Sequence, residues 1–371
     1  MHTDPVIDLF SASYAEARSK FLAAAAARGL AVDSRTLALE GADGETLATD
    51  VVLDGPADAS RMLVVISGVH GVEGFCGSAV QTGMLRLPES DRPVRGPDTA
   101  VLYVHAINPF GFSHLRRVTQ ENVDLNRNFV DFGQVLPVNA GYAEIHDLLL
   151  PPEWPPRSEV EAGLDSYRER HGARGLQRAI GLGQHVYADG MFFGGHAPTS
   201  SNLTFREILR RYTPQVRQLA SIDIHTGLGP YGVGERIFAS FDESPAVLAR
   251  AERWWGPLTS VTTGSSTSIP LTGPIQTALT EECAQAQHVG ICLEYGTHPS
   301  GRVTAALRAE HWLHRRGSAD VAQAEAIKRA LRDAFYPDAE DWKQRVWQQG
   351  LEACQQAIEG LQERTEDLCA A

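Results

Sequence analysis

The sequence lacks long hydrophobic runs and an excess of positive charge. Its 371 residues include no stretch of about eighteen apolar residues, the length that a membrane-crossing helix needs. The first ten residues are acidic and have no apolar signal core, so we expect a cytoplasmic protein. The net charge of −13 argues against nucleic acid and anionic membranes as partners. A small anionic substrate stays compatible with it, because such a molecule responds to local charge.

Cysteine is also scarce. The five cysteines, an odd number, show no Cys-x-x-Cys spacing, so the sequence predicts neither a disulfide framework nor a thiolate zinc site. A Gly-x-Ser-x-Gly nucleophile elbow is missing too, which argues against a serine hydrolase on an α/β sheet. A cysteine nucleophile at Cys76 is an alternative, but this residue falls in a predicted helix and is more typical of a small buried apolar side chain.

Residues 63–74, LVVISGVHGVEG, combine a predicted strand with two polar side chains. Leu63 to Ser67 are typical of a short buried strand, and the glycine-rich loop after them carries His70 and Glu73. Imidazole nitrogen and carboxylate oxygen are ligands of catalytic zinc, which takes two close ligands and a distant third. For His-x-x-Glu alone, a polar loop without metal is an equally good interpretation.

Strand-like and helix-like segments alternate along the first third of the chain. This alternation predicts an α/β fold, with a mostly parallel sheet and helices on its faces. The predicted helices cover residues 8–29 and 75–87, and the predicted strands cover residues 36–39, 46–53, 63–67 and 100–107.

Two further predicted strands also end in polar side chains. Residues 220–224 are followed by His225, and residues 289–295 carry Glu294 near their end. Ligands of open α/β sheets bind at the carboxyl ends of strands, so we expect both side chains beside the His-x-x-Glu loop. Asp223 precedes His225 by two residues. It either orients a neighbouring group or is an ordinary hydrogen-bonded aspartate at a strand end.

Residues 113–129 are polar and lack periodicity, which predicts a loop. Arginine suits carboxylate binding because its planar fork donates two parallel hydrogen bonds, although a solvated basic loop is the alternative. The candidate binding groups of this loop are Arg116, Arg117, Asn126, Arg127 and Asn128.

The rest of the chain adds helices and loops to one large domain. We predict a single catalytic domain over residues 1–338, in which residues 151–202 are an insertion or a pocket-lining segment. A helix is expected over 207–219, a loop over 259–280 and a C-terminal helix in 339–371. The apolar spacing of this last helix predicts packing on its own domain or, alternatively, contact with a second copy of the chain; its residues are Trp347, Leu351, Cys354, Ile358 and Leu361.

These side chains together match the needs of a hydrolytic metal site. A catalytic zinc takes three protein ligands and keeps one open position. His70, Glu73 and His225 supply two imidazoles and a carboxylate. Glu294 is then the candidate general base for a metal-activated water. One arginine would stabilise the oxyanion, and a second, with an asparagine, would hold a substrate carboxylate.

Four segments resemble the zinc-carboxypeptidase superfamily, in the family's order. HGVEG is similar to its His-x-x-Glu zinc motif, NVDLNRNF to its Asn-Arg carboxylate grip, IDIHTG to the third-ligand segment and LEYGTHPSG to the segment with the catalytic glutamate. The Asn-Pro pair at 108–109 is shared with the aspartoacylase and succinylglutamate-desuccinylase branch. GQHVYADGMFFGG further resembles a bacterial branch known only as a domain of unknown function.

The resemblance implies a three-layer α/β/α fold with a mixed sheet of about eight strands and one zinc per chain. His70, Glu73 and His225 are the implied ligands, and Glu294 the catalytic base. Arg117 is the first choice for the arginine that stabilises the oxyanion, and Arg116 is the second. Arg116 is also a candidate substrate-binding residue, together with Asn126 and Arg127.

The implied activity is hydrolysis of an amide bond next to a free carboxylate in a small peptide. An N-acyl-amino-acid deacylase and a non-catalytic zinc-binding module are the alternatives. Secreted carboxypeptidases carry signal and pro-segments and a mobile tyrosine, whereas Tyr231 is the only tyrosine between His225 and Glu294 here. These departures favour an intracellular enzyme.

Overall fold

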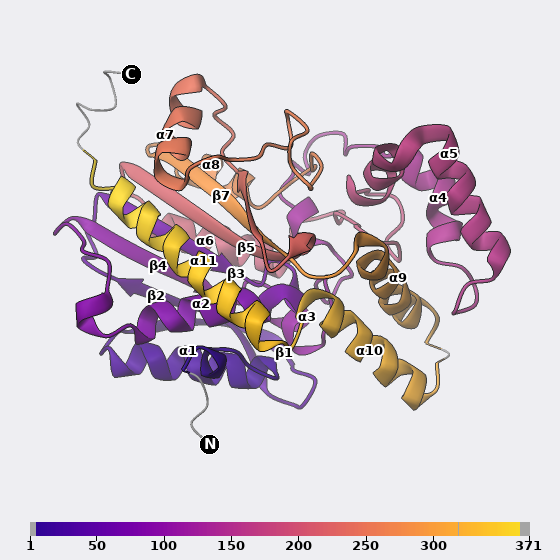
Figure 1. Ribbon diagram of the computed structural model, residues 1–371, viewed down its shortest axis with the longest axis horizontal. Helices are drawn as coiled ribbons and strands as arrows, with labels where there is room; N and C mark the ends of the chain where they lie inside the picture. Colours follow the sequence, from indigo (N-terminus) through magenta and orange to yellow (C-terminus); the bar gives the residue numbers. More distant parts are fainter. Residues whose placement is uncertain (1–4, 318, 364–371) are drawn as a thin grey trace.

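A twisted sheet runs through the centre of the molecule (Figure 1). The structure is a computed structural model and describes residues 5–317 and 319–363. In these residues the sheet has seven strands, in the order β1-β2-β4-β3-β5-β7-β6. The strands are β1 Val32–Glu40, β2 Thr46–Asp54, β3 Arg61–Ser67, β4 Thr99–His105, β5 Gln218–Tyr231, β6 Gly234–Phe238 and β7 Gln287–Gly296.

The predicted mixed sheet is confirmed, with parallel pairing confined to its centre. The strands β4, β3, β5 and β7 pair in parallel, while β1-β2, β2-β4 and β6-β7 are antiparallel. Thus half of the strand pairings, rather than most, are parallel. The described sheet has seven strands, close to the predicted number of about eight. Five residues join β1 to β2, too few for the crossover that a parallel pair requires.

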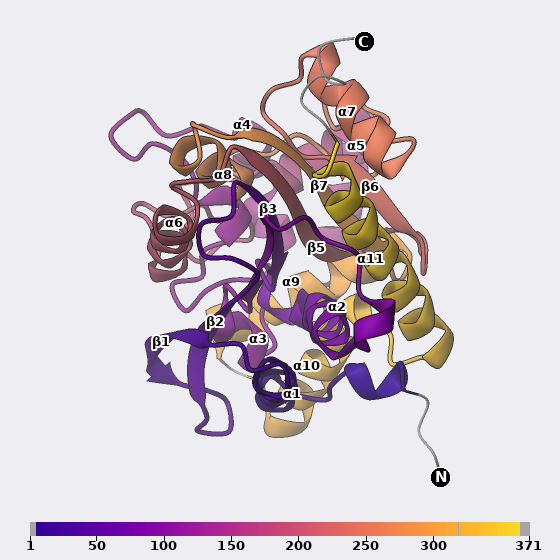
Figure 2. The same ribbon diagram turned by 90° about the vertical axis from the view of Figure 1, so that its left-hand side faces the viewer.

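Helices cover both faces of the sheet and make three layers (Figure 2). One apolar cluster joins the sheet to α1, α2, α7 and α11, and a second joins its other face to α6 and α8. The central strand β3 is therefore buried from Met62 to Ser67, which explains its unbroken apolar run. These helices are α1 Tyr14–Ala27, α2 Gly74–Arg86, α6 Ser200–Tyr212, α7 Pro245–Trp255, α8 Gln276–Glu282 and α11 Glu340–Gly360.

Four more helices form a lobe beyond one end of the sheet (Figure 1). Their apolar residues form a third cluster that includes Val72, the neighbour of Glu73. The lobe therefore packs directly on the predicted metal loop. Its helices are α4 Ala140–Leu149, α5 Ser158–Gly181, α9 Ser300–Arg316 and α10 Val321–Phe335; the short helices are α3 Pro109–Ser113 and the 3-10 turns η1 Ile7–Leu9, η2 Gly71–Glu73, η3 Glu89–Asp91 and η4 Leu125–Arg127.

The C-terminal helix α11 packs on α2 of its own domain. The Cβ that an alanine would add at Gly83 would lie 2.1 Å from the Trp347 ring, and one at Gly350 would lie 2.7 Å from Val80. Cys354, Ile358 and Leu361 are buried with the same cluster. The last part of the predicted helix segment 339–371, after residue 363, lies outside the described residues.

Several sequence-based predictions were wrong in their bounds. The helix expected at 207–219 is α6, Ser200–Tyr212; the Thr199 side chain caps its start by accepting from the Asn202 N–H, and Pro214 follows its end. Strand β5 continues past His225, so the glycines after it do not end the strand. The loop expected at 259–280 contains the start of α8, and the edge strand β6 was not predicted.

No helix in the described ranges is both long and apolar enough to cross a membrane.

We predict that His105 makes the free energy of unfolding depend on pH. Burial lowers its pKa from 6.5 to about 4, so the folded state keeps it neutral while the unfolded state protonates it. Stability is therefore lost as pH falls from 6.5 towards 4. In His105→Gln, the free energy of unfolding should fall less steeply over this range. The slope against pH should be smaller than that of the wild type by about 1.4 kcal/mol per pH unit. Urea denaturation at several pH values measures this, and exposed His171→Gln should keep the wild-type slope.

Candidate metal centre

The loop after β3 carries the first two candidate ligands. Gly68 has a φ of +69°, which lets the chain leave the strand and bring His70 and Glu73 back over its end. A Cβ at Gly71 would lie 2.0 Å from the carbonyl carbon of Gly111, so the loop needs glycine to pack on α3. The third candidate, His225, lies in β5, the parallel neighbour of β3. The sheet thus delivers all three side chains to one edge.

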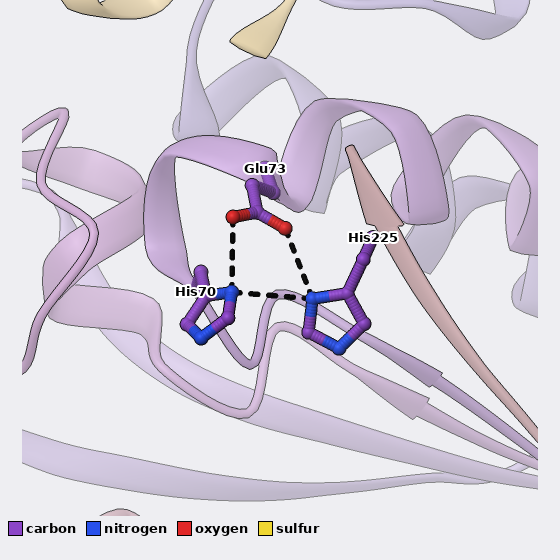
Figure 3. A group of neighbouring side chains, drawn as sticks. All are labelled: His70, Glu73 and His225. Atoms are coloured by element: carbon purple, nitrogen blue, oxygen red, sulfur yellow. Dashed lines mark hydrogen bonds and ion pairs between the residues drawn. The ribbon is translucent and has the colours of Figure 1, made fainter. Parts of the chain in front are cut away.

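The side chains of His70, Glu73 and His225 converge (Figure 3). One oxygen of Glu73 lies 2.9 Å from His70 Nδ1, and the other lies 3.0 Å from His225 Nδ1. The two Nδ1 atoms are 3.2 Å apart. One ligand atom from each residue lies within 4.8 Å of the others, and all three residues are buried. These are the three residues that the sequence predicted as ligands.

A buried carboxylate faces the outer nitrogen of each imidazole. His70 Nε2 lies 3.1 Å from Asp124 Oδ1, and His225 Nε2 lies 2.8 Å from Asp223 Oδ2. With each Nε2–H donated to its aspartate, both Nδ1 lone pairs point at one another and at Glu73. His70 Nε2 also lies 2.7 Å from Arg117 Nη2, which in this tautomer is a contact between two donors. Converging lone pairs with carboxylate-held rings fit a zinc ion.

The charges around the cluster also fit a divalent cation. The carboxylates are Glu73, Asp124, Asp223 and Glu294, and the arginines beside them are Arg117 and Arg127. All six residues are buried, and buried charges require compensation. With all four carboxylates ionised, their charge exceeds that of the two arginines by two. In the metal-free cluster protons compensate this excess, because the pKa of Glu294 is raised to about 8 and Asp223 and Glu73 raise the pKa of His225 well above its usual value. A bound zinc ion would take the place of these protons.

The carboxylates next to the imidazoles are held as anions. Burial alone would raise the pKa of Glu73, but His70 and His225 more than reverse this and hold it well below its usual range. Burial acts on Asp124 in the same way, and Arg117 and His70 lower its pKa well below the usual range. Metal ligands must be deprotonated, and the carboxylate of Glu73 meets this requirement. Burial would lower the pKa of His225, but Asp223 and Glu73 more than reverse this and raise it well above its usual value, so an ion that binds there displaces a proton.

Glu294 lies beside the third candidate ligand because β5 and β7 are in register. The pairing sets His225 directly opposite Glu294. The Glu294 carboxylate accepts from the Leu228 N–H at 3.0 Å, and burial followed by the charge of Glu73 raises its pKa to about 8. A carboxyl group with a pKa near neutrality can both accept and return a proton.

The structure gives the predicted arginines different partners. Arg117 donates from Nε to Asp124 at 2.9 Å and from Nη1 to Glu73 at 3.0 Å, so it touches the metal cluster. Arg127 donates from Nε to the Gly181 carbonyl at 3.0 Å, and Asn126 Oδ1 accepts from the Ile275 N–H at 2.8 Å. Arg127 Nη1 also lies 3.9 Å from Asp124 Oδ1, so Arg117 and Arg127 flank Asp124.

Arg116 does not join this group. Its Nε donates to the fully buried Glu310 at 2.8 Å, and its Nη2 donates to Asn122 at 3.0 Å. Lys328 and His314 bind the same Glu310 oxygen. These contacts correct its placement among the substrate-binding residues, because a guanidinium neutralising a buried carboxylate is held in the fold.

Sequence reasoning missed Phe192, which covers both arginines of the site. Its ring lies 5.2 Å from the Arg117 guanidinium carbon and 5.6 Å from that of Arg127. Its backbone has a φ of +52°, uncommon for a residue with a side chain. The glycine- and aromatic-rich composition of 183–202 indicated a pocket-lining segment, but not which ring would face the site.

Cys76 and Tyr231, two other residues considered in the sequence analysis, take no part in the chemistry of the cluster. Cys76 is buried, and burial with the nearby charge of Glu73 raises the pKa of its thiol well above the usual value, so no reactive thiolate forms. The Tyr231 hydroxyl donates to Asp341 at 3.1 Å on an exposed surface. The cysteine-nucleophile alternative is therefore disfavoured.

A family model described as "Protein of unknown function (DUF2817)" matches residues 10–349. The chain belongs to this family. The description agrees with the resemblance of residues 183–195 to a branch known only as a domain of unknown function, and it names no activity. No curated protein was found to match the sequence of this family member.

Several solved structures are similar to this DUF2817 chain. Bovine thrombin-activatable fibrinolysis inhibitor shares 11% identity over 96% of this chain and 98% of its own, with a TM-score of 0.47. Succinylglutamate desuccinylase from Chromobacterium violaceum shares 14% identity over 87% and 73%, with a TM-score of 0.37. Carboxypeptidase A from Helicoverpa armigera shares 12% over 88% and 74%, with a TM-score of 0.42.

We predict that the protein binds one equivalent of zinc and that the aspartates tune its affinity. His225→Ala should lose the ion on dialysis, because it removes a ligand. Asp124→Asn should keep the stoichiometry but bind about 10- to 100-fold more weakly, because the His70 ring loses its anionic partner. Metal analysis and chelator competition measure both effects. His196→Ala, whose ring bonds a backbone carbonyl, is the matched control and should bind as the wild type does.

Proposed function

We propose that this protein is a zinc-dependent amide hydrolase of the metallocarboxypeptidase type, which cleaves the bond next to a free carboxylate in a small peptide. The His70, Glu73 and His225 cluster, with both imidazoles held by aspartates, is the observation that carries the proposal. Glu294 on the adjacent strand supports chemistry in addition to binding, because a metal-binding module needs no general base.

The side chains divide the reaction into three tasks. Zinc, when bound, polarises the scissile carbonyl and acidifies water. Glu294 takes the proton of the attacking water and returns it to the leaving amine. Arg117, through N–H groups not used by Asp124 and Glu73, donates to the developing oxyanion. Arg127 with Asn126 holds the substrate carboxylate and so places the scissile bond.

The burial of the site supports a compact substrate. Glu294 is 7% exposed, Arg117 9% and Arg127 3%. Phe192 covers the two arginines from one side. Such a site suits a short peptide, and the same observation favours a second candidate function, deacylation of an N-acyl amino acid. Both reactions break an amide bond next to a carboxylate. They are separated by comparing the turnover of short peptides with that of N-acyl amino acids.

We predict metal-dependent hydrolysis that requires Glu294. Zinc-loaded protein should release the C-terminal residue from short peptides or the acyl group from N-acyl amino acids. Glu294→Gln should lower kcat by about 10²- to 10⁴-fold, because it removes the proton acceptor. Mass spectrometry of both substrate panels measures the products. Unchanged turnover in Glu294→Gln or after chelation would contradict the proposal, and full zinc binding without turnover of any substrate would favour the non-catalytic module.

We predict that Arg127 recognises the substrate carboxylate. Arg127→Met should lower kcat/KM for free-carboxylate substrates about 10- to 100-fold, the size of a charge-assisted hydrogen bond. The slow turnover of the matching C-terminal amides should change far less. Kinetics on each acid and amide pair measure the difference. Arg174→Met is the control, since Arg174 also donates to backbone carbonyls but on the exposed surface. An equal loss on acids and amides would assign Arg127 a structural role.

A further inference from the structure

The first turn of α8 contacts both halves of the site. The Gln276 side chain donates from Nε2 to Asp223 Oδ2 at 3.0 Å. The preceding backbone N–H, that of Ile275, donates to Asn126 Oδ1 at 2.8 Å. One face of this turn thus meets the aspartate behind the metal ligand His225, and the other meets the predicted carboxylate-binding asparagine. The sequence indicated only a loop in this region.

The contact with Gln276 decides how the Asp223 carboxylate is oriented. Asp223 is 1% exposed, and its Oδ2 accepts from both Gln276 and His225. Its other oxygen, Oδ1, has no hydrogen-bond partner within the described residues. Both hydrogen bonds therefore hold the carboxylate through the same atom, Oδ2. Without Gln276 it could rotate, and the imidazole of His225 would rotate with it.

The amide of Gln276 is itself rigidly placed. Ile275, Ala278 and Leu279 are buried in the cluster that packs α8 on the sheet. Gln276 is 7% exposed, so its side chain has little freedom to leave Asp223. The hydrogen-bonded series of Gln276, Asp223 and His225 therefore connects a packed helix to the metal-facing Nδ1.

We propose that Gln276 is a positioning residue for the metal centre, acting through Asp223 on the ring orientation of His225. The proposal rests on the proposed function only in that the cluster must bind a metal. Supporting partners of metal-bound histidines fix ring orientation and ligand basicity. A merely structural role, in which Gln276 compensates a buried carboxylate, would affect folding but not the metal.

The test compares Gln276→Met with Gln285→Met. Gln285 also donates from Nε2 to a single oxygen, the Thr213 carbonyl at 2.7 Å, but it lies just before the start of β7, at the opposite end of that strand from Glu294. We expect zinc to bind Gln276→Met about 3- to 10-fold more weakly, the value of one buried hydrogen bond, and Gln285→Met with wild-type affinity. Chelator competition gives the affinities. The visible spectrum of the cobalt-substituted protein should shift only in Gln276→Met.

A double-mutant cycle checks the route through Asp223. In an Asp223→Ala background, Gln276→Met should weaken zinc binding no further, because its acceptor is gone. Gln276→Asn, whose shorter side chain cannot reach, replaces Gln276→Met if that variant does not fold. Wild-type zinc affinity and cobalt spectrum in either folded variant would overturn the proposal, as would full additivity in the cycle.

The outcomes also separate this proposal from the proposed function. If the unsubstituted protein binds no zinc, both fail together. If it binds zinc but hydrolyses nothing, only the proposed function fails, and the affinities still test Gln276. If it hydrolyses its substrates and Gln276→Met loses only stability to urea, Gln276 is structural and the proposed function stands.

Discussion

Two buried aspartate–imidazole pairs determine the geometry of the candidate metal centre. Asp124 and Asp223 hold the outer nitrogens of His70 and His225, so the inner nitrogens are left 3.2 Å apart and both face Glu73. When each Nε2 donates its proton to its aspartate, the two Nδ1 lone pairs repel one another unless a proton or a metal cation lies among them. At His70 the Arg117 Nη2 donor, 2.7 Å from Nε2, opposes this tautomer.

The loop that carries His70 and Glu73 is fixed by its backbone as well as by its side chains. The N–H groups of Gly71 and Val72 donate to the carbonyls of Arg117 and Arg116, at 3.1 and 2.8 Å. Arg116 is in turn held by Glu310 of α9. The segment with Arg116 and Arg117 therefore has two functions in the structure. Arg117 reaches the metal cluster, and Arg116 fastens the segment to the lobe.

Much of the site followed from local sequence patterns. Apolar runs followed by His70 and His225, and one that carries Glu294 near its end, predicted a polar edge, and parallel register brought these residues together as expected. The placement of Arg116 did not follow, because nothing near it in sequence indicates a buried Glu310 almost two hundred residues away. Phe192 and Gln276 were missed for the same reason, since each reaches the site through contacts between distant segments.

The sequence alone determined the fold class and the residues that meet at the edge of the sheet, because strand periodicity and the polar groups at strand ends are local properties. The tertiary structure alone decided which groups support them. Long-range packing selects the partner of each buried polar side chain: Asp124 for His70, Glu310 for Arg116 and the Gly181 carbonyl for Arg127. Burial then shifts the pKa of Glu294 to about 8, because a carboxylate loses its hydration only when distant segments close around it.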